Sequence, residues 1–249
     1  MIRAVLFDLD NTLTDFVKMK DGAIVAAALA MIDMGLPLSL DEARRRIYAI
    51  YDREGIEYQR VFDHLLRDLY GQVPAPILAA GIIAYRRERD SQLVLYPHVK
   101  LTLIELLKRG LRLAVLSDAP ALQAWQRLHH LALQHIFDHV ITFDDTGERK
   151  PAAAPFRKAM ELLELPAEQM LMVGDWPERD MRGAAALGMR TVFARYGDTF
   201  GTVRSGADFE IDDLIELLEI VESLNRADEE DRAAGEPRPA VGREAKERE

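Results

Sequence analysis

Two aspartates near the N-terminus are the side chains of this sequence best suited to chemistry. Asp8 and Asp10 are separated by one residue and follow an apolar, strand-like run, Ile2 to Phe7. Because side chains alternate along a strand, both carboxylates are expected to point the same way. Like charges placed together repel, and a divalent cation removes that conflict; hard oxygen ligands of this kind suit Mg²⁺. Taken alone, the pair also fits a loop whose acids cap a helix.

Further polar residues stand at or just after the ends of three later strand-like runs. They are Ser117, Lys150, Asp175 and, five residues on, Asp180. In a parallel sheet all carboxyl ends share one edge, so these groups are expected to meet the aspartate pair there. Phosphoryl transfer to a carboxylate requires a nucleophile, a metal, a cation, a hydroxyl and a proton donor. The spacing itself indicates an anionic metal site at the edge of a sheet.

The segments that must position these residues alternate between strand-like and helix-like patterns. Five apolar runs have the character of strands: residues 2–7, 111–117, 139–143, 170–174 and 190–194. Helical patterns lie between them, at residues 101–109, 121–133, 155–165 and 179–187. This order predicts an α/β fold, a doubly wound parallel Rossmann-like sheet with helices on both faces.

A helical insertion interrupts that order. Its predicted helices lie within residues 23–34, 39–52, 58–70 and 76–89. An insertion after the first strand lies at the carboxyl end of the sheet, where ligands bind, so we expect a cap. The predicted divisions are a catalytic core of residues 1–15 and 96–225, a helical cap of residues 16–95, and a disordered tail of residues 226–249. That tail carries eight acidic and six basic side chains and almost no apolar ones.

The composition narrows the class of protein and its partners. The 249 residues are 49% hydrophobic and 30% charged, as in soluble globular proteins. A net charge of −10 argues against nucleic acid as the main partner. The lack of cysteine excludes thiolate nucleophiles and Cys-based zinc sites. No apolar run approaches the ~20 residues of a membrane helix, and no signal-peptide pattern opens the chain, so we expect no membrane partner and a cytoplasmic location.

The ordered motifs carry a resemblance to a known family. Phe7-Asp8-Leu9-Asp10-Asn11-Thr12, then Ser117, Lys150, and Gly174-Asp175 with Asp180, are similar to the four signature motifs of the haloacid dehalogenase superfamily. The likeness covers residues 2 to about 15 and about 96 to 214, and the insertion resembles the alpha-helical (C1) cap of one large subclass. It implies a magnesium-dependent phosphatase that hydrolyses a small phosphorylated metabolite through a phosphoaspartate.

The resemblance also implies roles for the acidic motif residues. Asp8 matches the nucleophile and a metal ligand. Asp10 matches the general acid and base, and its backbone carbonyl is expected to bind the metal. Thr12 matches the residue that orients Asp10. Asp175 matches a direct metal ligand, and Asp180 a supporting acid that holds the waters of the metal or Lys150.

The phosphate-binding groups follow from the same resemblance. Ser117 matches the hydroxyl and Lys150 the ammonium that bind the phosphoryl group. Asp118, where many relatives have another small polar residue, is expected either to contact substrate or to cap the next helix. Trp176 is expected either to wall the site or to pack. The acids at positions 144 and 145 indicate a solvated loop.

Asp10 separates the subfamilies. Dehalogenases usually lack this second aspartate, and the ion pumps carry threonine there, so its presence favours hydrolysis of phosphomonoesters. Sugar-phosphate mutases share Asp10 and stay an alternative. A second alternative is a non-catalytic, phosphate-binding or regulatory relative. A bacterial receiver module would be about half as long and would carry its aspartate on a later strand.

The cap offers candidates for substrate specificity without a motif that names the substrate. They are Arg53, Tyr58, His64, Arg67 and the cluster of Arg86, Arg87 and Arg89. Arginine suits a second anionic group on a substrate, although a solvated helix face is the expectation for the cluster. The apolar cap helices are expected either to bury one another or to be shared with a second copy in a homodimer.

Overall fold

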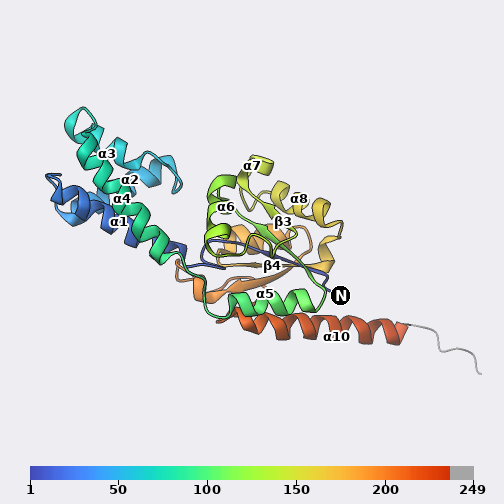
Figure 1. Cartoon of the computed structure of the whole chain (residues 1–249). Coiled ribbons are helices and arrows are strands. Elements are labelled where there is room, and N and C mark those ends of the chain that lie inside the picture. Colours follow the sequence, from blue (N-terminus) through green and yellow to red (C-terminus); the bar gives the residue numbers. More distant parts are fainter. Residues whose placement is uncertain (236–249) are drawn as a thin grey trace, which may run out of the picture.

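The computed structural model describes residues 1–235, where six parallel strands form one sheet in the order β3-β2-β1-β4-β5-β6 (Figure 1). The strands are β1 Ala4–Phe7, β2 Arg112–Leu116, β3 His139–Ile141, β4 Met170–Gly174, β5 Arg190–Ala194 and β6 Phe209–Ile211. Phe7 at the end of β1 pairs with Val115 of β2 and Val173 of β4. The predicted α/β class is confirmed, and β1 lies in the middle of the sheet.

Both faces of the sheet are covered because the strands are apolar on both sides. Val5 and Phe7 of β1 face one core, and Ala4 and Leu6 face the other. On the first face pack α5 Val99–Lys108, α6 Ala121–His130 and α10 Leu217–Gly235. On the second pack α8 Ala153–Leu163, the π-helical turn η2 Pro177–Met181 and α9 Arg182–Ala185. Figure 1 shows α5 and α10 side by side beneath the sheet.

The first four helices after β1 form a group that lies to one side of the sheet (Figure 1). These helices are α1 Phe16–Asp33, α2 Leu40–Glu54, α3 Val61–Tyr70 and α4 Ala75–Gln92. They enclose a hydrophobic core of their own, with Ile24, Ile47 and Leu65 among its members. Two connections join this cap to the sheet, and they are tied together where Thr14 Oγ1 donates to the carbonyl of Val94 at 2.6 Å.

Several short elements complete the described chain. They are α7 Phe143–Thr146, and the 3₁₀ turns η1 Ala167–Gln169, η3 Arg195–Gly197 and η4 Leu214–Glu216. Strand β6 was not predicted, because three residues are too short a run to carry a periodic pattern. The third strand ends at Ile141, and the expected loop after it is wrong: Thr142 and Asp145 form a capping box that opens α7.

The tail prediction is wrong for residues 226–235, which belong to α10. Two features favour the helix there: Leu217 and Val221 bury its first turns, and Arg226 pairs with Glu222 one turn earlier. The amino group of Met1 also pairs with Asp228. The remaining predicted tail, 236–249, lies outside the described residues. Within residues 1–235, no helix has the length and apolar character that crossing a membrane would need.

Candidate active site

The chain turns sharply directly after β1. Asp8 continues the sheet pairing, with its N–H donating to the carbonyl of Val173 at 2.9 Å. Asn11 has a φ of 59°, in the left-handed region that Asn tolerates better than most residues. Its Oδ1 accepts from the N–H of Val17 at 3.1 Å, which ties the turn to the first helix of the cap. The turn keeps Asp8 buried at the carboxyl edge of the central strand.

Lys150 brings the predicted motifs together. Its Nζ lies 2.5 Å from Oδ1 of Asp8 and 2.6 Å from Oδ1 of Asp180, and all three side chains are buried. Its backbone N–H donates to Oδ1 of Asp118 at 2.9 Å. Burial would lower the pKa of the Lys150 ammonium, but Asp180, Asp8 and Asp118 together raise it above its ordinary value. The ammonium is therefore a fixed positive charge beside the Asp8 carboxylate.

Three carboxylates gather around that ammonium. Asp8, Asp175 and Asp180 each offer an oxygen, and these oxygens lie within 4.8 Å of one another. Burial, with Asp8 and Asp180 nearby, raises the pKa of Asp175 well above its ordinary value. Burial also raises the pKa of Asp180 to about 6, against the opposing effect of Lys150. One ammonium does not neutralise three buried carboxylates, and hard oxygen donors with excess negative charge fit a divalent cation such as Mg²⁺.

Gly174 and Gly197 allow the close packing of the carboxylates and the turn after β1. The sequence predicted no role for either glycine. A Cβ on Gly174 would lie 2.4 Å from Cγ of Asp180. A Cβ on Gly197 would lie 1.7 Å from the carbonyl oxygen of Asn11 and 3.1 Å from Cβ of Asp175. Only a residue without a side chain lets η3 approach the turn after β1 so closely.

Thr12 is placed differently from the expectation. Its hydroxyl donates to Oδ1 of Asp175 at 3.2 Å, so in this structure Thr12 orients the predicted metal ligand and does not bond to Asp10. The carbonyl of Thr12 accepts from the hydroxyl of Tyr196 at 2.7 Å. Tyr196 is a positioning residue that the sequence did not indicate, because the 3₁₀ turn η3 is too short to carry a periodic pattern.

Asp10 is not part of the three-carboxylate group, and it contacts an arginine that pairs with the cap. Its Oδ1 lies 3.3 Å from Nε of Arg127 on α6, and Nη2 of Arg127 pairs with Glu57 of the cap. The Arg127 guanidinium also lies 4.6 Å from the ring centroid of Phe16, at the start of α1. Burial raises the pKa of Asp10 to about 7; Asp8 and Glu57 act in the same direction and Arg127 opposes them. A carboxyl with that pKa can both give and take a proton near neutral pH.

The sequence did not predict a role for Arg127 or Glu57 at the site. A signal for Arg127 was present: it shares the buried stripe of α6 with Ala124 and Leu128, where a charged residue demands a partner. Glu57 lies in the loop between α2 and α3, and no pattern indicated it.

Two further predicted residues, Ser117 and Asp118, lie next to the site. Ser117 is buried at the end of β2, and its Oγ accepts from the N–H of Ala119 at 3.2 Å. Asp118 bonds through one oxygen to the Lys150 backbone and through the other to Nη1 of Arg179 at 3.0 Å. It is not a helix cap, because the N–H of Ala121 at the start of α6 donates to Asp144 instead.

Trp176 packs between two neighbours. Its ring centroid lies 4.4 Å from that of Phe200, and the guanidinium of Arg179 lies 3.6 Å from its ring centroid. Its backbone N–H donates to Oδ2 of Asp180 at 3.1 Å. Trp176 therefore supports Asp180 from the loop after β4.

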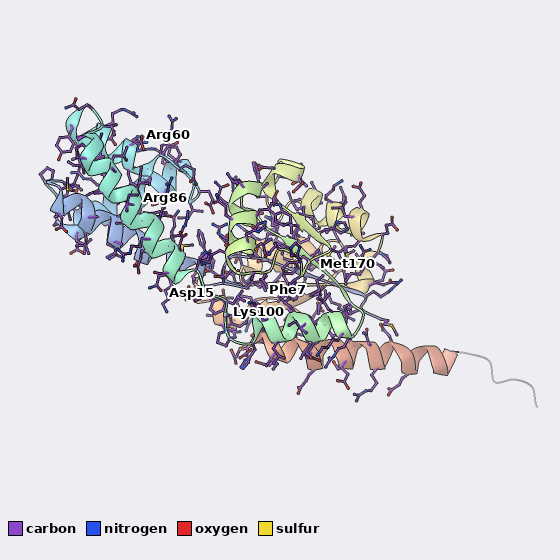
Figure 2. The ribbon with its side chains drawn as sticks, in the orientation of Figure 1. Phe7, Asp15, Arg60, Arg86, Lys100 and Met170 are labelled. Carbon is purple, nitrogen blue, oxygen red and sulfur yellow. The ribbon has the colours of Figure 1, made fainter. Side chains whose placement is uncertain are left out.

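The predicted cap candidates form no hydrogen bond or ion pair with Asp8, Asp10 or Lys150. Nη2 of Arg53 is 3.1 Å from Nε2 of His64, whose ring packs against Tyr58. Figure 2 shows Arg60 and Arg86 on the cap, beyond Asp15 at its junction with the core. Arg67, Arg86 and Arg87 are exposed, and Arg89 pairs with Asp90. The arginine cluster is the solvated face that was expected.

Comparisons with known proteins agree with this geometry. The family description "haloacid dehalogenase-like hydrolase" matches residues 2–188. A glyceraldehyde 3-phosphate phosphatase of Pyrococcus furiosus is 32% identical over 237 residues, covering 94% of this chain and 99% of that protein. A phosphoglycolate phosphatase of Vibrio cholerae is 32% identical, covering 88% of this chain and 97% of that protein.

A solved structure is also similar. The crystal structure of a HAD phosphatase from Thermococcus onnurineus has a TM-score of 0.65 and 27% identity, covering 88% of this chain and 98% of that chain. The match over most of the chain leads to one conclusion: this protein belongs to the haloacid dehalogenase-like hydrolases, as its motifs predicted.

Proposed function

We propose that this protein is a magnesium-dependent phosphatase that transfers the phosphoryl group of a small phosphate ester first to Asp8 and then to water. The observation that carries the proposal is the buried ammonium of Lys150, 2.5 Å from an oxygen of Asp8 at the carboxyl edge of the central strand. That pair combines a nucleophile with a cation that can bind the phosphoryl oxygens.

The residues around Asp8 fit the binding of both phosphate and metal. Ser117 and Lys150 would bind the phosphoryl oxygens from one side. Asp8, Asp175 and the carbonyl of Asp10 would hold Mg²⁺ on the other, with Asp180 fixing Lys150. The ion supplies positive charge that neutralises the phosphoryl oxygens during transfer.

The transfer needs two steps, and Asp10 would act as the acid in the first and as the base in the second. In the first, an oxygen of Asp8 forms a bond to phosphorus, the bond from phosphorus to the leaving oxygen breaks, and Asp10 gives that oxygen its proton. In the second, water attacks phosphorus while Asp10 takes a proton from it, and the bond between phosphorus and Asp8 breaks. The pKa of about 7 suits Asp10 to both steps.

The cap would enclose the leaving group. Glu57 of the cap reaches Arg127, which in turn reaches Asp10, so the cap meets the core next to the proton donor. Closure would exclude water during the first step, and opening would release the alcohol.

The substrate class rests on the relatives, which are named for small phosphorylated metabolites. A putative β-phosphoglucomutase from Thermotoga maritima has a TM-score of 0.69 at 20% identity, a likeness of fold alone, so the mutase stays the weaker alternative. We also propose a cytoplasmic location, because charged esters do not cross membranes unaided. A homodimer stays a prediction.

The test is phosphate release from a panel of small phosphomonoesters, with Mg²⁺ and with a chelator. Release that needs Mg²⁺ in the wild type and vanishes in Asp8→Asn supports the proposal. Release that persists with chelator, or in Asp8→Asn, contradicts it. Conversion of a sugar monophosphate to its isomer, with a bisphosphate activator and without phosphate release, would favour the mutase.

A further inference from the structure

Lys20 stands apart from the other buried cations of the protein. In residues 1–228 the buried lysines and arginines are Lys20, Arg127 and Lys150. Arg127 and Lys150 pair with carboxylates, whereas the side chain of Lys20, which is only 6% exposed, forms no hydrogen bond or ion pair with another described residue. Lysines are rarely so buried unless they are paired with an anion, so the presence of Lys20 here calls for a reason.

The surroundings of Lys20 are two phenol rings. Its Nζ lies 4.3 Å from the ring centroid of Tyr51 on α2 and 5.5 Å from that of Tyr85 on α4. Such rings attract a cation through their faces but use none of its three N–H donors. The two rings therefore hold the ammonium in place, and no other described residue uses its N–H donors.

The position of Lys20 relates it to the acid and base. Lys20 follows Phe16 by four residues on α1, so both lie on the same side of that helix, about 6 Å apart along its axis. Phe16 contacts Arg127, and Arg127 contacts Asp10. A leaving group that starts at Asp10 and extends into the cap would meet Lys20 about one helical turn beyond Phe16.

We propose that Lys20 is a specificity-determining residue whose ammonium binds a carbonyl-type oxygen, of a carboxylate or an aldehyde, on the leaving group of the ester. This inference rests on the proposed phosphatase function and names the class of substrate: short phosphomonoesters with such an oxygen two or three carbons from the phosphoryl group. An ester that lacks this oxygen forgoes the hydrogen bond to the ammonium and binds less well.

The test compares three esters that differ in this oxygen: 2-phosphoglycolate, glyceraldehyde 3-phosphate and ethyl phosphate. In Lys20→Met, which keeps the length of the stem, kcat/KM for the first two should fall about 10- to 100-fold, mainly through KM, because one charged hydrogen bond is lost. Ethyl phosphate should be turned over as in the wild type, and Lys20→Arg should recover part of the loss. Lys18→Met, an exposed lysine on the same helix, is the matched control and should change none of the three.

Two outcomes overturn the inference: an equal loss for all three esters in Lys20→Met, or no loss for either oxygen-bearing ester. A binding measurement separates this inference from the proposed function. By calorimetry with Mg²⁺, Asp8→Asn should bind 2-phosphoglycolate about tenfold or more tightly than Asp8→Asn/Lys20→Met does, and both should bind ethyl phosphate alike. That selective loss supports the role of Lys20 even if no ester is hydrolysed, whereas equal affinities contradict it even if the phosphatase activity is established.

Discussion

Nε of Arg127 lies 3.3 Å from Oδ1 of Asp10 while the same guanidinium pairs with Glu57 of the cap. One side chain therefore joins the proposed acid and base in the core to the domain that covers the leaving group. Movement of the cap that breaks the pair with Glu57 would change the charge around Asp10. The charge of Glu57 raises the pKa of Asp10, so this pair with the cap favours the protonated form that donates to the leaving group.

Substitutions of Arg127 and Glu57 should shift the pH dependence of kcat/KM in opposite directions. Asp10 must be protonated to serve the leaving oxygen, so kcat/KM should fall as pH rises through its pKa of about 7. Arg127→Met removes a charge that lowers this pKa and should move the alkaline limb to higher pH. Glu57→Gln removes a charge that raises it and should move the limb to lower pH. Shifts of the same sign in both variants would contradict this account of Asp10.

Asp10→Asn should separate binding from turnover. The amide cannot donate to the leaving oxygen or take a proton from water, so turnover should fall by roughly 10² or more. The substitution leaves the proposed phosphate-binding residues Ser117 and Lys150 unchanged. Inhibition by inorganic phosphate should therefore be close to that of the wild type. A near-normal rate in steady-state assays would remove Asp10 from its role.

The cluster of Asp8, Asp175 and Asp180 predicts that Mg²⁺ stabilises the folded protein. Mg²⁺ at about 100 times its Kd should add about 2.7 kcal/mol to the free energy of unfolding by mass action. Asp175→Asn should lose most of that increase in a denaturant titration with and without Mg²⁺. Asp145→Asn is the control: it weakens the N-terminal capping box of α7 and should keep the increase in stability that Mg²⁺ gives. Equal responses to Mg²⁺ in wild type and Asp175→Asn would place the metal elsewhere.

Gly197 offers a test of the packing under the site. Ala at this position would put a Cβ 1.7 Å from the carbonyl oxygen of Asn11, which forces the turn after β1 to move. Overpacking of this kind costs about 1–3 kcal/mol, and kcat should fall because Asp175 moves as well. Gly22→Ala on α1, whose Cβ would meet nothing within 3.6 Å, should be neutral or stabilising. Equal stabilities of the two variants in denaturant would contradict the tight contact.

Much of the core was predictable because its signals are local. The apolar runs that end in Asp8, Ser117 and Asp175 identify strands, and parallel strands bring those residues to one edge. The motif order then identified the family. The short strand β6 lacked any comparable signal, and the charged composition after residue 225 concealed the end of α10.

The cap contributions to the site could not be predicted in the same way. Glu57 meets Arg127, and Lys20 meets the rings of Tyr51 and Tyr85, through tertiary packing that depends on the shapes of many side chains. The bond from Thr12 to Asp175 likewise depends on the approach of two turns 163 residues apart in sequence. Arg127 alone carried a signal, as a charge within a buried helical stripe.

The central claim is that the phosphoryl group passes through Asp8, and a quench experiment tests it most directly. The protein would be mixed with Mg²⁺ and an excess of the best ester, quenched in acid within milliseconds, and digested for peptide mass spectrometry. A phosphoryl group on Asp8 in the wild type, formed no more slowly than turnover and absent from Asp8→Asn, is the predicted result. Rapid phosphate release with no phosphoryl group on Asp8, or undiminished turnover by Asp8→Asn, would contradict the account.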